Sequence, residues 1–175
     1  MDPFHIIPEC YVDTNLVSAL LGGIGVNHQK SCNNVISLMK GKFKDGFAVG
    51  IIDDDKRKPQ YLNECAVLAQ SNHLRLLKHP QKDHYIITVS PAVEAFILRV
   101  AEDAGVAMAQ YGLPSELDGL KRITKHIVSN KNSKLMILFR DLSNVGEFNI
   151  LRKILGYLLE KGYSADLEEL VSFFQ

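Results

Sequence analysis

The sequence contains no tryptophan, few cysteines and no excess of charge of either sign. Its three cysteines, Cys10, Cys32 and Cys65, are odd in number and scattered, so they do not form a disulfide framework. They also lack the Cys/His spacing that is typical of structural zinc. The first residues lack the basic flank and apolar core of a signal peptide. Together these absences predict a protein of the reducing cytoplasm.

Long hydrophobic runs are absent as well. No apolar run approaches the ~20 residues that a membrane-spanning helix needs, so we expect no membrane association. Lys and Arg total 20, as do Asp and Glu, which gives a formal net charge of zero. This balance argues against a nucleic-acid partner held by bulk positive charge alone. Such a partner would need a local basic patch or a bridging metal ion.

The length and composition are those of one ordinary globular domain. The chain has 175 residues, of which 46% are hydrophobic and 23% charged. A domain of this size buries roughly 70% of the surface of its unfolded chain, so the fold needs no disulfide or metal to hold it.

The first half of the chain alternates between strand and helix patterns. The continuously apolar segment 47–52 predicts a strand in the interior of a sheet, covered on both faces. Ser90 and Pro91 predict a helix over 91–105, with a capping hydroxyl followed by proline at the first position. The other segments expected to form strands are 4–7, 73–77 and 84–89, and the other expected helices are 13–21, 33–40 and 60–71.

The second half is nearly all helix. Ser115 and Asp118 form a capping-box pattern for a helix over 116–129, and an apolar stripe predicts another over 146–161. Ser164 is expected to cap a last helix that ends at Phe174, whose apolar end could support a homo-oligomer. The segment 135–139 is ambiguous between strand and helix.

These patterns predict an α/β fold, with a mostly parallel sheet of about four strands and helices on both faces. We expect an α/β core over residues 1–110. The helices of residues 111–175 form a C-terminal appendage packed on the same core, so that the chain is one domain overall.

Acidic residues follow two of the predicted strands. Glu9 follows the first strand, and Asp53, Asp54 and Asp55 follow the central one. Ligand sites of open α/β sheets lie beyond the carboxyl ends of the strands, and Asp53 and Asp55 can point the same way because extended side chains alternate. Gathered carboxylates repel one another unless a cation lies between them, and oxygen ligands suit Mg²⁺ or Mn²⁺. The alternative is a solvated, aspartate-rich turn.

Basic residues and histidines offer further candidates. Lys56, Arg57 and Lys58 follow the acids directly and could clamp a phosphate, or they could simply form a solvated turn. His79 and His84 flank a predicted turn, where a histidine either contacts a substrate or has no special role.

The order of the acids resembles the Toprim domain shared by topoisomerases, primases and OLD-type nucleases. A strand is followed by Glu9, by Asp13 at the start of a helix, and later by a strand that ends in Asp53-x-Asp55. The resemblance covers roughly residues 4–105. Where the family usually has glycine after the first glutamate, this sequence has Cys10. No base accompanies Cys10 in the sequence, so we expect a small buried side chain rather than a nucleophile.

A second motif extends the resemblance. The segment from Ser90 and Pro91 to Glu94 is similar to the Pro-x-x-Glu helix start of small RloB-like Toprim proteins from bacterial defence systems.

The resemblance implies a role for each acid. Glu9 would be the general acid/base or a metal ligand, and Asp53 and Asp55 would hold Mg²⁺ or Mn²⁺. Glu94 and Asp13 would be accessory acids and additional ligands. Their alternative role is structural, because a carboxylate in the first turn of a helix interacts favourably with the helix dipole.

The implied activity is Mg²⁺-dependent phosphodiester hydrolysis, or a related phosphoryl transfer, on nucleic acid or a nucleotide, in bacterial phage defence. Lys56 and Arg57 would bind the substrate. The alternative is a non-catalytic Toprim-like module that binds a partner protein or a nucleotide. A separation of more than about 8 Å between Glu9 and Asp53 would exclude a shared cation.

Two other families with acidic strand ends fit less well. In haloacid-dehalogenase-type phosphatases the Asp-x-Asp motif closes the first strand. Receiver domains carry an acidic pair after the first strand, where this chain has only Glu9.

Overall fold

The computed structural model describes residues 1–54, 59–126 and 132–175. Asp55, Lys56, Arg57 and Lys58 therefore lie outside the described residues, as does the last part of the helix predicted over 116–129. None of the described helices has both the length and the apolar character needed to cross a membrane.

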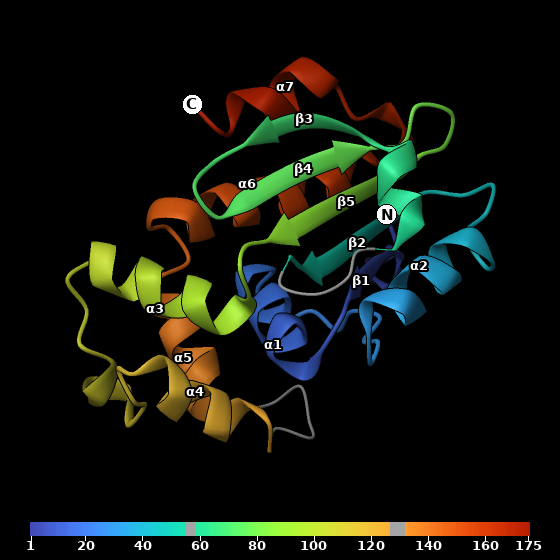
Figure 1. Ribbon diagram of the computed structural model, residues 1–175. Helices are drawn as coiled ribbons and strands as arrows, with labels where there is room; N and C mark the ends of the chain where they lie inside the picture. Colours follow the sequence, from blue (N-terminus) through green and yellow to red (C-terminus); the bar gives the residue numbers. More distant parts are fainter. Residues whose placement is uncertain (55–58, 127–131) are drawn as a thin grey trace.

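The described residues form an open five-stranded sheet in the order β1-β2-β5-β4-β3 (Figure 1). Strands β1, β2 and β5 are parallel, whereas β4 runs antiparallel to β5, and β3 runs antiparallel to β4. The α/β class is thus confirmed, but the sheet is mixed and has one strand more than expected. The strands are β1 (Ile6–Pro8), β2 (Ala48–Asp53), β3 (Ala66–Gln70), β4 (Leu74–Lys78) and β5 (His84–Val89).

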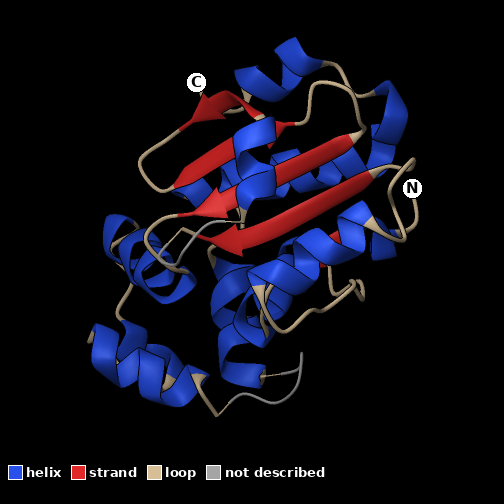
Figure 2. Ribbon diagram, turned by 45° about the vertical axis from the view of Figure 1, so that its right-hand side comes forward, coloured by secondary structure: helices blue, strands red, loops and turns tan. Residues whose placement is uncertain are grey.

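Helices cover both faces of the sheet (Figure 2). They are α1 (Tyr11–Leu20), α2 (Cys32–Lys40), α3 (Val93–Asp103), α4 (Leu117–Thr124), α5 (Ser133–Asp141), α6 (Gly146–Lys161) and α7 (Leu167–Ser172). One core cluster joins α1, α3, α5 and α6 to alternate residues of the strands. A smaller cluster joins α2 and the 3-10 turn η2 (Gln60–Glu64) to the opposite face.

Strand β2 lies in the interior of the sheet, as its apolar run predicts. It pairs with β1 on one side and β5 on the other, and its residues 48–52 are buried. Gly50 allows α2 to lie close to the strand, since an added Cβ would be 2.8 Å from Sδ of Met39 and 3.0 Å from Cγ1 of Val35. The strand thereby directs Asp53, its last residue, to the carboxyl edge of the sheet.

The expectation of a helix over 60–71 is wrong. This segment forms the short turn η2 and then β3, which adds to the sheet as an edge strand. The register of β3 shifts between Val67 and Ala69, and this irregularity obscures the alternation that marks a strand in a sequence. Pairing with β4 satisfies the backbone here and outweighs the helical preference of alanine.

Two expected helix starts also differ. Ser90 and Pro91 are joined by a cis peptide bond and precede α3, which begins at Val93 with Ala92 at its N-cap. Neither residue therefore occupies the capping position that the sequence predicts. Helix α4 begins at Leu117 without a side-chain cap, so the capping box expected from Ser115 is absent.

At the two ends of the chain the elements shift by a few residues. The first strand begins at Ile6, after a 3-10 turn, and includes Pro8. The last helix is capped by Asp166, which accepts the backbone N–H groups of residues 168 and 169, rather than by Ser164. The ambiguous segment 135–139 is helical, as part of α5.

The C-terminal helices share the main core with the sheet. Phe148 of α6 packs edge-on against Phe96 of α3, with ring centroids 5.1 Å apart, and against Phe139 of α5 at 5.8 Å. All three rings are fully buried. The region 111–175 therefore packs on the α/β core through large apolar side chains, which fixes α4 and α5 beside the carboxyl edge of the sheet.

Candidate functional site

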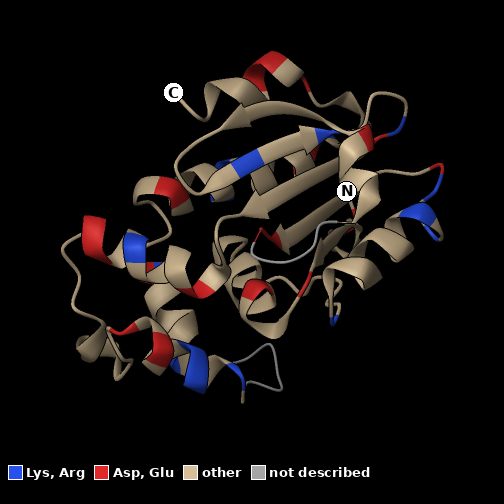
Figure 3. Ribbon diagram, in the orientation of Figure 1, with Lys and Arg blue, Asp and Glu red and all other residues tan. Residues whose placement is uncertain are grey.

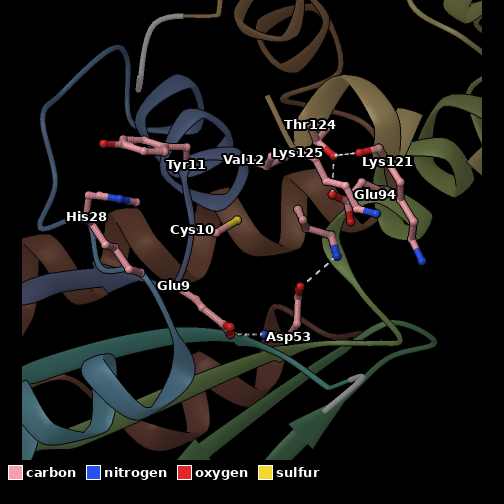
Figure 4. A pocket seen from close by; sticks show the side chains of 12 residues that line it. Glu9, Cys10, Tyr11, Val12, His28, Asp53, Glu94, Lys121, Thr124 and Lys125 are labelled. Atoms are coloured by element: carbon pink, nitrogen blue, oxygen red, sulfur yellow. Dashed lines mark hydrogen bonds between the residues drawn. The ribbon is translucent and has the colours of Figure 1, made fainter. Parts of the chain in front are cut away.

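A cavity of about 500 Å³ lies at the carboxyl ends of β1 and β2, between the starts of α1 and α3 and the end of α4 (Figure 4). It is the type of position at which open α/β sheets bind ligands. Its lining residues are Glu9, Cys10, Tyr11, Val12, His28, Lys30, Asp53, Val93, Glu94, Lys121, Thr124 and Lys125.

Glu9 and Asp53 are direct neighbours on one side of the cavity. The Oε2 of Glu9 accepts a hydrogen bond of 3.1 Å from the backbone N–H of Asp53. The Oδ1 of Asp53 in turn accepts a bond of 3.0 Å from the backbone N–H of Val93, the first residue of α3. Both carboxylates are thus held by backbone donors, and Asp53 also lies at the positive end of a helix dipole.

Asp13 is buried in the first turn of α1. It occupies the third position of α1, where its Oδ2 accepts the backbone N–H of Cys10 at 3.2 Å in a capping box. Its Oδ1 has no hydrogen-bond partner among the described residues. Burial, together with the negative charges of Glu9 and Glu94, raises the pKa of Asp13 to about 7, although bonds from Cys10 oppose the shift. Asp13 therefore changes its charge near neutral pH, next to the other acids.

Glu94 lies in the first turn of α3, as the sequence predicts. Its Oε1 accepts a hydrogen bond of 2.6 Å from the hydroxyl of Thr124, the last residue of α4. Glu94 thus connects two helices that line the cavity. Figure 3 shows the acidic residues near the ends of the parallel strands and basic residues on and just after α4.

Cys10 is partly buried against the main core and serves as the N-cap of α1, so the expectation of a small buried side chain is met in part. Its sulfur accepts the backbone N–H of Asp13 at 3.5 Å. Burial, followed by the charge of Asp13, strongly raises the pKa of the thiol, which therefore stays protonated.

Two groups of lining residues were not found from the sequence. Lys121 and Lys125 are four residues apart on one side of α4 and its end, a spacing that could have indicated a shared cationic face. Lys30 adds a third ammonium group from the segment before α2. Tyr11 and His28 form a stacked pair that nothing in the sequence pattern predicts.

His79 and His84 do not line the cavity. His84 is fully buried, with Nδ1 2.6 Å from the Tyr61 hydroxyl and Nε2 2.8 Å from the carbonyl oxygen of Phe43. Burial lowers the pKa of His84, which favours the neutral ring. His79 stacks on Tyr61 with ring centroids 5.3 Å apart. Both histidines thus belong to a packed aromatic group around Tyr61, away from the acids.

Within the described ranges, no three His, Cys, Asp or Glu side chains form a ready-made metal site. Glu9, Asp53 and Glu94 line one cavity, whereas Asp13 does not, and the contacts that hold the three lining acids are two to backbone groups and one to Thr124. Asp55, the remaining expected ligand, lies outside the described residues.

The fold and the site together define a class: an α/β protein with an open mixed sheet and an acid-lined cavity at its carboxyl edge. Comparisons with protein families, with curated proteins and with solved structures find no match for this chain. Any assignment of function therefore depends on the geometry and chemistry of the cavity itself.

Proposed function

We propose that the chain is a metal-dependent phosphoesterase, which hydrolyses phosphodiester bonds or catalyses a related phosphoryl transfer on nucleic acid or a nucleotide. The observation that carries this proposal is the contact between Glu9 and Asp53 at the ends of adjacent parallel strands. It brings two acids to a cavity whose other side carries lysines. An acid that holds a cation and an acid that moves a proton, next to ammonium groups that bind phosphate, suit a polyanionic substrate.

Asp53, with Asp55, would hold Mg²⁺ or Mn²⁺ next to Glu9. The donor chemistry fits, because a carboxylate oxygen that accepts an N–H bond has a second lone pair for a cation. Mg²⁺ usually retains several waters and binds through one or two carboxylates plus substrate phosphate, so a complete protein cage is not required. When bound, such an ion neutralises a phosphate oxygen and increases the acidity of the attacking water.

Side chains of the cavity supply proton transfer and phosphate binding. Glu9, which is 4% exposed and fixed by the Asp53 N–H, takes the proton from the attacking water. Lys30, Lys121 and Lys125 neutralise the phosphates next to the cleaved bond. Lys56 and Arg57 would add to this group from the segment that follows Asp53. In this proposal the order of the acids resembles that of Toprim domains because both place catalytic and metal-binding acids at the ends of parallel strands.

A second candidate is a non-catalytic module that binds a nucleotide or a partner protein. It is favoured by the absence of a three-residue metal group from the described part of the chain. A cavity of about 500 Å³ is also within the range of ordinary small-molecule sites. The two candidates make different predictions for Glu9, because only the enzyme needs its proton transfer.

The test is hydrolysis by metal-stripped protein with Mg²⁺ or Mn²⁺ added back. Substrates are labelled single-stranded DNA, single-stranded RNA and the simple diester bis(p-nitrophenyl) phosphate. Glu9→Gln and Asp53→Asn retain an oxygen that accepts the same backbone N–H, so the fold is preserved. We expect each to reduce kcat by about 100-fold or more, the usual scale of general acid–base catalysis and of metal assistance.

Asp45→Asn is the matched control, because Asp45 is an exposed acid before the opposite end of β2. It should leave the rate unchanged. If wild type binds metal and ligand but hydrolyses none of the substrates, or if Glu9→Gln is as active as wild type, the binding module replaces the enzyme.

A further inference from the structure

One wall of the cavity is aromatic and apolar and plays no part in the proposed hydrolysis. It consists of Tyr11, Val12 and His28, and we call it the aromatic wall. The rings of Tyr11 and His28 are stacked, with centroids 3.8 Å apart and planes at 13°. Figure 4 shows this pair on one side of the pocket and Lys121 with Lys125 on the other, with Glu9 and Asp53 below them.

The hydrogen bonds around His28 favour one of the two positions for the proton of its neutral ring. The Thr14 hydroxyl donates its one hydrogen to the carbonyl oxygen of Cys10 at 2.7 Å. The same hydroxyl lies 3.0 Å from Nδ1 of His28, and in the arrangement in which Thr14 makes both bonds it accepts there, with Nδ1 as the donor. Burial lowers the pKa of His28, which favours the neutral ring. Nε2 is consequently a bare acceptor.

That acceptor is buried, and it has no hydrogen-bond partner among the described residues. A buried polar atom without a partner is costly, because it has lost water and gained nothing in return. Since His28 lines the cavity, a ligand with an N–H donor on a flat ring would satisfy Nε2 and pack on the aromatic wall at the same time. The amino group of a nucleobase has this chemistry.

We propose that the cavity binds a single nucleotide unit, with its base against the aromatic wall and an exocyclic amino group of the base donating to Nε2 of His28. This inference rests on the proposed function, because it names the substrate class of the same site. The phosphate of the nucleotide lies toward Lys121, Lys125 and the acids. Adenine, cytosine and guanine carry such an amino group, and the nucleotide is either free or the end of a single strand.

The size of the cavity supports one nucleotide rather than a duplex. About 500 Å³ accommodates a small molecule but not two paired strands. The zero net charge of the chain also disfavours tracking along a long polyanion, whereas three lysines suffice for the phosphate of one unit. Stacking on an aromatic side chain is the usual way in which proteins hold an unpaired base.

The experiment is calorimetric titration of the Mg²⁺-loaded protein with adenosine 5′-monophosphate, purine riboside 5′-monophosphate and ribose 5-phosphate. The second ligand lacks only the amino group, and the third lacks the base. We expect affinity to fall roughly fivefold to tenfold without the amino group, the effect of one hydrogen bond, and further without the base. A short single-stranded oligoadenylate, compared with the monophosphate, distinguishes a strand end from a free nucleotide.

Two variants distinguish the contribution of the hydrogen bond to His28 from that of stacking on Tyr11. His28→Phe keeps a flat ring but removes Nε2, so it should bind the first two ligands equally. Tyr11→Leu should weaken both while keeping their ratio. The matched control is His79→Phe, which alters the other Tyr–His stack, at Tyr61 and away from the cavity, and should change neither affinity nor ratio. Unfolding curves establish that each variant is folded.

The results distinguish this inference from the proposed function. The proposal that the aromatic wall binds a nucleobase, which we call the base site, is refuted by either of two results. Ribose 5-phosphate binds as tightly as adenosine 5′-monophosphate, or His28→Phe retains the preference for the amino group. Hydrolysis of bis(p-nitrophenyl) phosphate that depends on Glu9 would still support the phosphoesterase. Discrimination between the two purine ligands without hydrolysis of any diester would support the base site and refute the enzyme.

Discussion

Thr124 donates a hydrogen bond of 2.6 Å to the Oε1 of Glu94 and so joins the end of α4 to the first turn of α3. Lys121 and Lys125 are carried by the same short helix and its end. This bond, together with the burial of Leu120 in the main core, holds two of the three cavity lysines in position.

Thr124→Val should weaken substrate binding more than it slows the reaction. Valine has the same shape but cannot donate, so α4 loses its bond to Glu94 and the lysines become less well positioned. We expect KM to rise several-fold with little change in kcat, and stability to fall by about 1–3 kcal/mol, the cost of losing a hydrogen bond to a charged group. Steady-state kinetics and urea unfolding measure the two effects.

Tyr61→Phe is the matched control for this experiment. It removes the hydroxyl that lies 2.6 Å from Nδ1 of His84 and should cost about 1–3 kcal/mol, because it leaves a buried acceptor without its donor. Tyr61 does not line the cavity of the acids, so KM should stay at its wild-type value. Equal changes of KM in both variants would show that Thr124 acts only through overall stability.

Asp13→Asn should change how stability depends on pH. The pKa of Asp13 is raised to about 7 in the folded state, from an ordinary value near 4, so the folded chain binds a proton that the unfolded chain has lost. Wild-type stability therefore falls as pH rises from about 4 to 7 and then levels off. Since each pKa unit corresponds to about 1.4 kcal/mol, the effect is on the order of a few kcal/mol.

Asparagine retains the oxygen that accepts the Cys10 N–H but cannot ionise. The variant should accordingly be more stable than wild type at pH 8, and the two proteins should approach each other at pH 4.5. Urea unfolding at several pH values provides the measurement. A pH profile that is the same in both proteins would mean that Asp13 titrates outside this range.

Mg²⁺ or Mn²⁺ should raise the melting temperature of metal-stripped protein at millimolar concentration or below. An ion that binds only the folded state stabilises it by mass action, by about 2.7 kcal/mol at 100 times its dissociation constant. Asp53→Asn should abolish the shift, and Asp45→Asn should retain it. Melting curves that do not respond to either ion would count against metal binding by the acids.

Phe148→Ala should destabilise the whole chain in a single step. The ring is fully buried between Phe96 and Phe139, so its removal should cost about 3–5 kcal/mol. One unfolding transition, seen by both circular dichroism and tyrosine fluorescence, is expected if residues 1–110 and 111–175 form one domain. Ile137→Ala, at a side chain that is half exposed, should have little effect. Two separate transitions would contradict the one-domain prediction.

The parts of the fold that the sequence predicts best are those with a long, regular pattern. Helix α6 spans the predicted residues 146–161, and β2 occupies the interior of the sheet. The segment 60–71 was misassigned because its strand is short, exposed and irregular at Val67, so its conformation depends on pairing with β4. Such pairing is a tertiary effect that local propensity does not contain.

The acids of the site could be predicted because each one follows a strand or begins a helix. Glu9 and Asp53 are found by that logic, whereas Glu94 became a candidate through the resemblance to the Pro-x-x-Glu helix start. The lysines and the aromatic wall could not, because His28 reaches the cavity from a segment without regular structure. Lys121 reaches it from a helix more than a hundred residues beyond Glu9. Tertiary packing brings these positions together, and for Lys121 it includes the bond between Thr124 of α4 and Glu94 of α3.

The outer edge of β1 has a consequence for how the protein behaves at high concentration. The backbone N–H groups of Asn27 and Gln29 donate to the carbonyl oxygens of Ile6 and Pro8, at 3.0 and 2.9 Å. Pro8 has no N–H to offer on that side. These carbonyl groups are therefore not available to pair with a strand of another molecule. Aggregation by edge-to-edge strand pairing is disfavoured at this edge of the sheet.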